Sequence, residues 1–155
     1  MVKKICFVCH GNICRSPMAE FWFKDLLKKL GEQDNYIVES RATSTEEIGN
    51  PPHHGTMRKL AQYGIVPRNK YAEQLKHSDY DKYDLIIGMD DANIRNILRI
   101  TGGDRLNKVK KLPEFAGKDK SIADPWYTGN FEETFEDVRE GCDGLLEYLG
   151  ITDKR

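Results

Sequence analysis

The hydrophobic pattern of the first 31 residues predicts a strand, a tight turn and a helix. Residues 2–9 form a short apolar run rich in strand formers, and residues 10–12 follow as a turn signal. Ser16 and Pro17 then suit the N-cap and the first position of a helix, and Gly31 suits its end. The apolar positions of this helix recur at steps of three or four, and they are Met18, Phe21, Trp22, Leu26 and Leu30.

The rest of the chain alternates the same two patterns. Further strands are predicted at residues 36–40, 83–89 and 109–115. Further helices are predicted over a short segment from Met57 to Gly64, over a segment that Asp90 or Asp91 caps and Gly102 ends, and over residues 131–149. Residues 116–130 carry the composition of a loop.

Strands that alternate with helices indicate an α/β fold with a parallel sheet. With 155 residues, no linker and no internal repeat, we expect a single domain over residues 1–155. Such sheets bind ligands at the carboxyl ends of their strands. The loop after the first strand lies at that end, which makes it the first place to look for chemistry.

Composition narrows the classes of function. The 24 basic and 25 acidic residues give a net charge of −1, so we expect no nucleic-acid partner. No apolar run is long enough to span a membrane, and residues 5–9 are too short for a secretory leader. We therefore expect a cytoplasmic protein without membrane insertion, whose 4 cysteines serve a purpose other than disulfides.

Residues 9–16 combine the features of an oxyanion site. A strand-to-helix loop presents unpaired amides and the positive end of a helix dipole to an anion. Gly11 and Asn12 tolerate positive φ, which lets successive amides turn inward. Arg15 adds a planar fork that matches two oxygens of a phosphate. The loop therefore predicts a cradle for a tetrahedral oxyanion.

Cys9 begins this loop, and the same surroundings favour its thiolate. A thiolate that faces a bound phosphoryl group is a nucleophile, and attack would produce a phosphocysteine intermediate. Cys6 and Cys9 stand three apart in a predicted strand, so their side chains point to opposite faces. This spacing argues against a haem, zinc or dithiol site, and we expect no metal.

The residues Cys9-His10-Gly11-Asn12-Ile13-Cys14-Arg15-Ser16 resemble the C-x5-R-S signature of the low-molecular-weight protein tyrosine phosphatases. Asp124-Pro125 resembles the acid loop of that family, and the resemblance extends over nearly the whole chain. It implies a three-layer domain, in which a four-stranded parallel sheet has helices on both faces and the phosphate-binding loop follows the first strand. It also implies catalysis without a metal or an organic cofactor.

The resemblance assigns roles to individual residues. Cys9 would be the nucleophile, Arg15 would bind phosphate and stabilise the transition state, and Asp124 would act first as general acid and then as general base. Ser16 would donate a hydrogen bond to the Cys9 thiolate. The phosphate-binding residues would be His10, Gly11, Asn12, Ile13, Cys14, Arg15 and Ser16.

Other implied roles concern the support and regulation of the loop. Asn12 and Ser40 would hold its strained shape, together with Ser16. Cys14 is either a plain small residue or a redox partner that forms a reversible disulfide with Cys9.

The substrate cleft is expected to be lined by His10, Ile13, Glu46, Trp126 and Tyr127. The chain departs from the family at Glu46, where many members carry an aromatic residue, and we hypothesise an altered peptide preference. It also lacks, in residues 69–75, a histidine that often supports the phosphate loop.

The expected substrate is a phosphotyrosine-containing protein, with inorganic phosphate as a product. One alternative is a protein-arginine phosphatase, but such relatives carry Thr where this chain has Ile13, and an apolar side chain suits a phenyl ring better. An arsenate reductase is a second alternative, although residues 15–141 hold no cysteine for its relay. A third is a non-catalytic phosphate-binding module, which would be expected to have lost the nucleophile or the acid.

Overall fold

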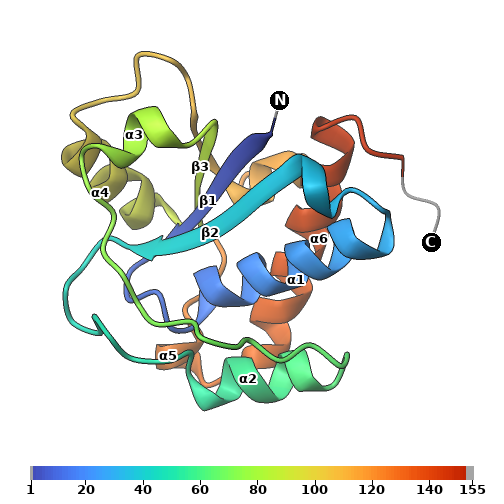
Figure 1. The fold of residues 1–155 in the computed structure, drawn as a ribbon. Coiled ribbons are helices and arrows are strands. Elements are labelled where there is room, and N and C mark those ends of the chain that lie inside the picture. The colour runs from blue at the N-terminus through green and yellow to red at the C-terminus, as the bar shows by residue number, and fades with distance from the viewer. Residues whose placement is uncertain (1, 153–155) are drawn as a thin grey trace.

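The computed structural model describes residues 2–152, which fold into a single α/β domain around a four-stranded parallel sheet (Figure 1). The strands follow the order β2-β1-β3-β4, so the first strand is central. Their bounds are β1 Lys3–Cys9, β2 Tyr36–Ala42, β3 Leu85–Gly88 and β4 Val109–Lys111. The four strands predicted from the sequence are all present, and the predicted parallel α/β class is confirmed.

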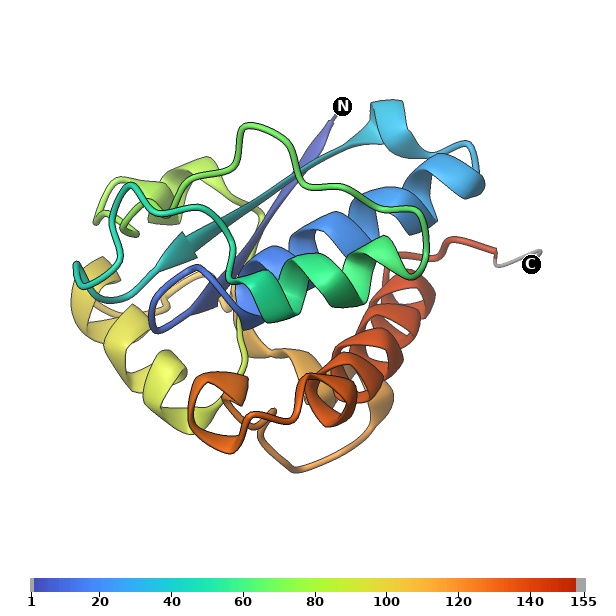
Figure 2. The ribbon, with the colours of Figure 1, turned by 90° about the horizontal axis from the view of Figure 1, so that it is seen from below.

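Helices cover both faces of the sheet, which makes three layers. Figure 2 shows α1, α2 and α6 on one side of the strands and α3 and α4 on the other. The α-helices are α1 Arg15–Lys29, α2 His54–Ala61, α3 Asp79–Lys82, α4 Asp91–Thr101, α5 Pro125–Thr128 and α6 Phe131–Tyr148. Two short 3-10 helices complete the described elements, η1 Gln33–Asn35 and η2 Leu112–Ala116.

The alternation of side chains along β1 divides the core in two. Phe7 and Cys9 belong to the larger hydrophobic cluster, which α1 and α6 complete. Cys6 and Val8 belong to the smaller cluster, which includes Ile97 of α4. Cys6 and Cys9 therefore point to opposite faces of the sheet, as the period of a strand predicts.

Several helix ends follow the sequence signals. The Asp90 carboxylate accepts a hydrogen bond from the Asn93 amide and forms a capping box at the start of α4. Gly102 ends the same helix in the left-handed conformation, with φ of 79°. This cap holds Asp90, the second residue after β3, at the carboxyl edge of the sheet.

Three predictions about local structure were wrong. The strand predicted to run to residue 115 ends at Lys111, because Pro113 has no amide to donate and residues 112–116 turn into η2. The predicted loop over residues 116–130 contains the one-turn helix α5. Ser16 is not the N-cap of α1, since that helix already begins at Arg15, with Cys14 at the cap position.

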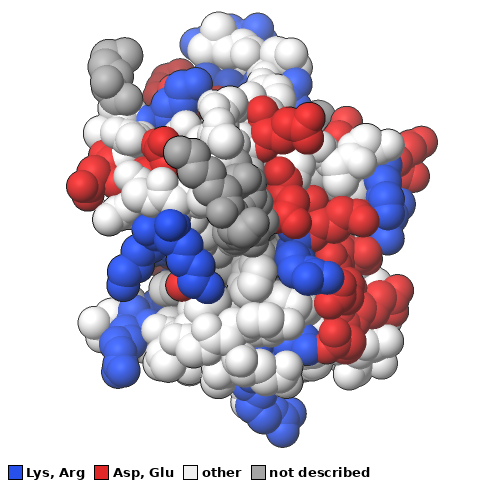
Figure 3. All heavy atoms as spheres, turned by 90° about the vertical axis from the view of Figure 1, so that its right-hand side faces the viewer, with Lys and Arg blue, Asp and Glu red and all other residues white. Residues whose placement is uncertain are grey.

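The surface carries both signs of charge. On the face shown in Figure 3, Asp and Glu side chains gather on one side, and Lys and Arg side chains stand in separate groups. Within residues 2–152, no helix is long and apolar enough to cross a membrane. The same residues contain no group of three or more His, Cys, Asp or Glu side chains that could hold a metal ion.

Candidate active site

The loop between β1 and α1 is held in place by backbone hydrogen bonds from two other segments. The Thr43 amide donates to the Cys9 carbonyl at 3.0 Å, and the Ser44 amide donates to the His10 carbonyl at 3.0 Å. On the other side, the His53 amide donates to the Ile13 carbonyl at 2.7 Å. The segments that follow β2 and precede α2 therefore fix both arms of the loop at the carboxyl edge of the sheet.

Cys9 lies at the base of the loop with its sulfur directed at the start of α1. The Ser16 amide approaches Sγ at 3.4 Å, and the Ser16 hydroxyl lies 3.1 Å from it. Cys9 is only 2% exposed. A sulfur that contacts the first turn of a helix experiences the positive end of the helix dipole, which favours a negative charge there.

Arg15 is the most enclosed charged group of the site, with a residue exposure of 2%. Its Nη1 donates to Asp90 Oδ2 at 2.7 Å and to the Ile122 carbonyl at 3.0 Å. Its Nε is buried and has no hydrogen-bond partner among residues 2–152. Burial alone would lower the pKa of Arg15, but Cys9, the hydrogen bond to Asp90 and the charge of Asp124 outweigh burial and raise that pKa.

Asp124 caps α5 and lies beside the guanidinium of Arg15. Its Oδ1 accepts a hydrogen bond from the Trp126 amide at 3.1 Å, and its Oδ2 lies 3.4 Å from Arg15 Nη2. The preceding residue is fixed from α6, because the Thr134 hydroxyl donates to the Ala123 carbonyl at 2.9 Å. Pro125 occupies the first position of α5, where its fixed φ suits a helix start. The carboxylate is thus held at the mouth of the loop.

Beneath the loop, Asn12 connects three segments of the chain. Its Nδ2 donates to Ser16 Oγ at 2.8 Å and to Ser40 Oγ at 2.9 Å, and its Oδ1 accepts from the Glu73 amide at 3.2 Å. Asn12 adopts a left-handed conformation with φ of 59°, an arrangement that costs an ordinary side chain about 1–2 kcal/mol. Asn12, Ser16 and Ser40 are each no more than 1% exposed.

Both Gly11 and Asn12 tolerate a positive φ, and of the two only Asn12 adopts one. At position 11 the glycine is required by close packing and not by a positive φ. A Cβ at position 11 would stand 3.3 Å from Cγ of Glu47, which is tighter than ordinary contact. Gly11 therefore lets the segment that carries Glu47 pack closely on the loop.

A cleft of about 50 Å³ opens above the loop. Its walls contain the whole set of predicted cleft residues together with Cys9 and Asp124, and the set is His10, Ile13, Glu46, Trp126 and Tyr127. At the rim, His10 Nε2 and Glu46 Oε2 lie 3.0 Å apart. Trp126 and Tyr127 are 56% and 80% exposed, so the aromatic wall faces solvent.

Cys14 lies in the loop and also lines the cleft, but its chemistry differs from that of a nucleophile. Burial raises its pKa to about 12, and the charges of Cys9 and Asp124 act in the same direction. Cys14 is therefore a neutral thiol at pH 7. The four cysteines are free in the structure, and the reversible disulfide with Cys9 stays a prediction.

Sequence reasoning did not assign a role to several residues that the structure places at the site. Asp90, which binds Arg15, follows the apolar run of β3, and its position at a carboxyl strand end was the available signal. Glu47 lines the cleft beside Glu46. Lys70, in the stretch that lacks the family's histidine, reaches the Ser40 carbonyl with its Nζ at 2.9 Å. No local pattern could have revealed that contact.

Comparisons with known proteins agree with this geometry. The chain is 41% identical over 148 residues to the low molecular weight protein-tyrosine-phosphatase YfkJ of Bacillus subtilis, covering 94% of each chain. The crystal structure of YfkJ superposes with a TM-score of 0.93 at 38% identity, over 97% of this chain and 96% of that one.

Two further solved structures have the same fold. A low molecular weight protein tyrosine phosphatase from Streptococcus pyogenes matches with a TM-score of 0.86 at 42% identity, covering 99% of this chain and 95% of that one. The Drosophila arginine phosphatase matches with a TM-score of 0.86 at 27% identity, covering 97% and 99%. The sequence pattern of the family described as low molecular weight phosphotyrosine protein phosphatase matches residues 4–154. The chain therefore belongs to the low molecular weight phosphotyrosine protein phosphatase family.

Proposed function

We propose that this protein hydrolyses phosphotyrosine in proteins through a phosphocysteine intermediate and releases inorganic phosphate. The observation that carries the proposal is that Cys9 and Asp124 line one cleft, with the sulfur at the start of α1 and the carboxylate 3.4 Å from the buried guanidinium of Arg15. The names of the relatives, which are protein-tyrosine-phosphatases, support the same activity.

In the first step, the Cys9 sulfur attacks phosphorus and the bond to the tyrosine oxygen breaks. The phosphoryl oxygens are received by the loop amides and by the Arg15 fork, whose buried Nε is an available donor. Asp90 and the Ile122 carbonyl hold Nη1 and so orient the guanidinium. Asp124 gives its proton to the leaving phenolate, which makes the leaving group neutral.

In the second step, a water molecule attacks phosphorus and the bond between sulfur and phosphorus breaks. Asp124, now a carboxylate, accepts a proton from that water. Cys9 departs as a thiolate, and the hydroxyl of Ser16, 3.1 Å from Sγ, donates a hydrogen bond to the developing charge. The products are the free enzyme, with Cys9 restored, and inorganic phosphate.

The cleft walls favour an aryl substrate over a phosphoarginine. Ile13 is 8% exposed and lines the cleft with an aliphatic surface, while Trp126 and Tyr127 form an aromatic wall. A phenyl ring gains from apolar burial and ring contacts on these surfaces. Because the arginine phosphatase has the same fold, phosphotyrosine and phosphoarginine peptides should be compared directly, and we expect faster hydrolysis of the tyrosine ester.

The direct test is hydrolysis of para-nitrophenyl phosphate in the presence of EDTA by the wild type, Cys9→Ser and Asp124→Ala. We expect metal-independent turnover that Cys9→Ser abolishes and that Asp124→Ala reduces by at least about 100-fold. A folded wild type that binds vanadate without any turnover would instead show a phosphate-binding module. Trapping of radioactive phosphate on Cys9 after acid quenching distinguishes a phosphocysteine from direct attack by water.

We also propose a cytoplasmic location, because a nucleophilic thiol must remain reduced. The four cysteines are buried and unpaired in the structure, an arrangement typical of a reducing compartment. A fusion to a redox-sensitive fluorescent reporter would locate the protein and report the potential around it.

A further inference from the structure

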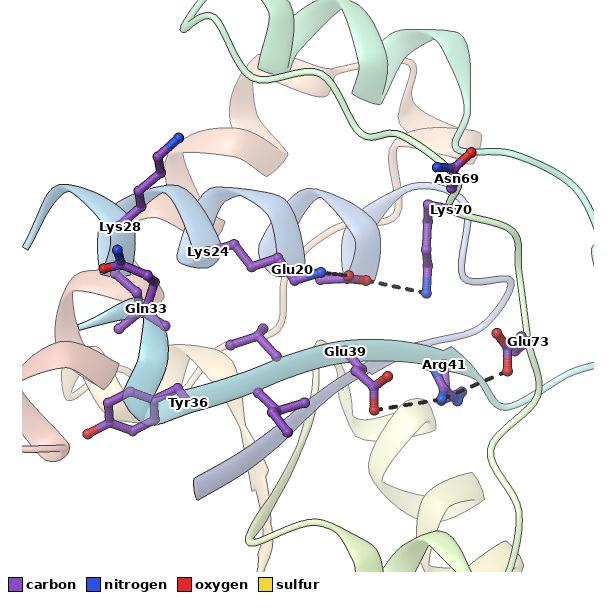
Figure 4. A pocket seen from close by; sticks show the side chains of 13 residues that line it. Glu20, Lys24, Lys28, Gln33, Tyr36, Glu39, Arg41, Asn69, Lys70 and Glu73 are labelled. Atoms are coloured by element: carbon purple, nitrogen blue, oxygen red, sulfur yellow. Dashed lines mark hydrogen bonds and ion pairs between the residues drawn. The ribbon is translucent and has the colours of Figure 1, made fainter. Parts of the chain in front are cut away.

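A larger cavity lies behind the hydrogen-bonded side chains of the phosphate loop and shares no lining residue with the substrate cleft. It has a volume of about 550 Å³ and opens between α1, β2 and residues 69–73 (Figure 4). Figure 4 shows Lys70 reaching from that segment toward Glu20 on α1, and Arg41 on β2 near Glu39 and Glu73. The cavity is therefore walled by charged groups, several of which are buried.

Glu20 is the most enclosed carboxylate of this cavity, with a side-chain exposure of 4%. Its Oε2 accepts from Lys24 Nζ at 2.6 Å, and its Oε1 accepts from Ser40 Oγ at 2.6 Å. Lys70, whose side chain is 9% exposed, places Nζ 3.3 Å from the same Oε1 and also donates to the Ser40 carbonyl at 2.9 Å. Two cations thus compensate a carboxylate that water barely reaches.

The hydrogen bonds that lead from Glu20 have a fixed direction. A serine hydroxyl has a single proton, and a carboxylate can only accept, so Ser40 gives its proton to Glu20. Ser40 can then only accept from Asn12 Nδ2, at 2.9 Å. The orientation of Asn12 is set independently, because the Glu73 amide occupies its Oδ1.

The same direction continues to the nucleophile. The second proton of Asn12 Nδ2 goes to Ser16 Oγ at 2.8 Å, so the Ser16 oxygen accepts there. The single proton of Ser16 is left to point at Cys9 Sγ, 3.1 Å away. A hydrogen bond donated to sulfur favours the thiolate, whereas a hydroxyl turned the other way would favour the neutral thiol.

We propose that Glu20 and Lys70 are positioning residues for Cys9, which act through Ser40 and Asn12 to keep the Ser16 hydroxyl directed at the sulfur. The inference rests on the proposed role of Cys9 as the nucleophile. Neither residue touches the substrate cleft, whose lining contains no part of the cavity behind the loop. The two residues fix the direction and rigidity of the hydrogen bonds that lead to Cys9. Lys70 Nζ contacts both the Ser40 carbonyl on β2 and the Glu20 carboxylate on α1.

Loss of either charge removes a different part of this arrangement. In Glu20→Gln the side-chain amide can donate to Ser40 and release the serine proton to compete for Asn12. In Lys70→Met the carboxylate loses a cation and the Ser40 carbonyl loses a donor. Both changes leave Cys9, Arg15 and Asp124 in the chain. If the ion pair between Glu20 and Lys70 were purely structural, its loss would lower the stability of these variants, but Cys9 would react as in the wild type.

The test is the pH dependence of Cys9 alkylation by iodoacetamide, followed by mass spectrometry of the peptide that contains Cys9. This measurement needs no turnover, so it separates failure of this inference from failure of the proposed function. We expect Glu20→Gln and Lys70→Met to shift the midpoint of alkylation to higher pH. We also expect para-nitrophenyl phosphate hydrolysis to lose about tenfold in kcat, the size of one weakened charged hydrogen bond, with little change in KM.

Controls distinguish positioning from a general effect of charge. Lys70→Arg keeps the cation and should recover most of the wild-type profile, and Lys28→Met removes an exposed lysine from the rim of the same cavity and should match the wild type. Ser40→Ala breaks the same path without removing a charge and should shift the midpoint in the same direction. It serves as the test if the charge variants do not fold.

Folded variants that show wild-type alkylation profiles and wild-type kcat would overturn the inference, and a lowered melting temperature alone would then assign Glu20 and Lys70 a structural role. A shifted midpoint in enzymes without any turnover would support the positioning of Cys9 and reject the phosphatase activity.

Discussion

Below the phosphate loop, Asn12, Ser16 and Ser40 are at most 1% exposed, whereas Trp126 and Tyr127 at the cleft mouth are 56% and 80% exposed. The floor of the site, meaning the loop and the hydrogen-bonded side chains beneath it, is fixed by contacts at 2.6–3.1 Å from β2, α1 and residues 69–73. The rim, meaning the exposed cleft walls, is held by ring packing and by solvent-facing pairs such as His10 with Glu46.

This difference matches the two tasks of such a site. Buried polar groups in a low dielectric are costly unless every partner is present, so a satisfied network holds one geometry. Preorganised donors of this kind act on the transition state. Exposed aromatic and charged groups adapt to different ligands and contribute mainly to binding. Changes in the floor should therefore lower kcat, and changes in the rim should alter KM and selectivity.

The largest effect is expected from Arg15→Lys. A lysine is a point charge that cannot hold Asp90 and the Ile122 carbonyl while presenting a fork to phosphate. We expect kcat/KM for para-nitrophenyl phosphate to fall by about 1000-fold. Arg139→Lys on the outer face of α6 is the matched control and should leave activity unchanged. A loss below about tenfold would show that the guanidinium geometry is not needed.

Asn12 separates hydrogen bonding from backbone strain. Asn12→Gly keeps the left-handed conformation but removes the side-chain bonds, so we expect kcat to fall by about 10- to 100-fold. Asn12→Ala should lose a similar rate and a further ~1 kcal/mol of stability, measured by urea unfolding, because Ala resists a φ of 59°.

Asn107 provides the control for strain, since it is exposed and has φ of 55°. Asn107→Gly and Asn107→Ala should reproduce the stability difference without any change in kcat. Equal stabilities for Asn12→Gly and Asn12→Ala would contradict the strain at Asn12.

At the rim, the packing of Trp126 should depend on pH through His53. The two rings contact edge to face with centroids 5.7 Å apart, and His53 also stacks on Phe131. Burial, together with His54 and Arg58, lowers the pKa of His53 below its ordinary value of 6.5. The folded protein therefore prefers the neutral ring. The stability that the neutral His53 ring contributes is present above pH 6.5 and is lost as the pH falls through the lowered pKa of His53.

We expect Trp126→Ala to raise KM for aryl phosphates by about threefold to tenfold, with little change in kcat. In a Trp22→Phe protein with His53 intact, acidification below the ordinary pKa of histidine should redshift the emission of Trp126. His53→Phe should remove that pH dependence. An unchanged pH response in His53→Phe would assign the transition to another group.

The smallest effect is expected at Glu46, whose side chain is 70% exposed. An acidic rim repels acidic neighbours of the phosphotyrosine, so Glu46→Gln should raise kcat/KM for peptides rich in Asp or Glu by about twofold to threefold. Basic peptides should lose a similar factor, and high salt should remove both changes. Glu147→Gln, on α6, is the charge-matched control. Equal ratios for both peptide classes in both enzymes would remove any role of Glu46 in selectivity.

The sequence by itself determined the parts of the site that lie close together along the chain. Cys9, Arg15 and Ser16 occur within a single strand–loop–helix unit, so local spacing predicted the cradle, and the alternation of strands and helices predicted the parallel sheet. Asp124 was found only through the resemblance, because a carboxylate before a proline is also a common turn signal.

The tertiary structure decided which distant residues complete the floor. Parallel register brings the carboxyl ends of β1, β2 and β3 to one edge, and this places Ser40 and Asp90 beside the loop. Packing of α1 on β2 directs Glu20 at Ser40, and residues 69–73 deliver Lys70. Local patterns report the conformation of neighbouring residues, whereas these contacts depend on the relative placement of whole elements, which only the folded core fixes.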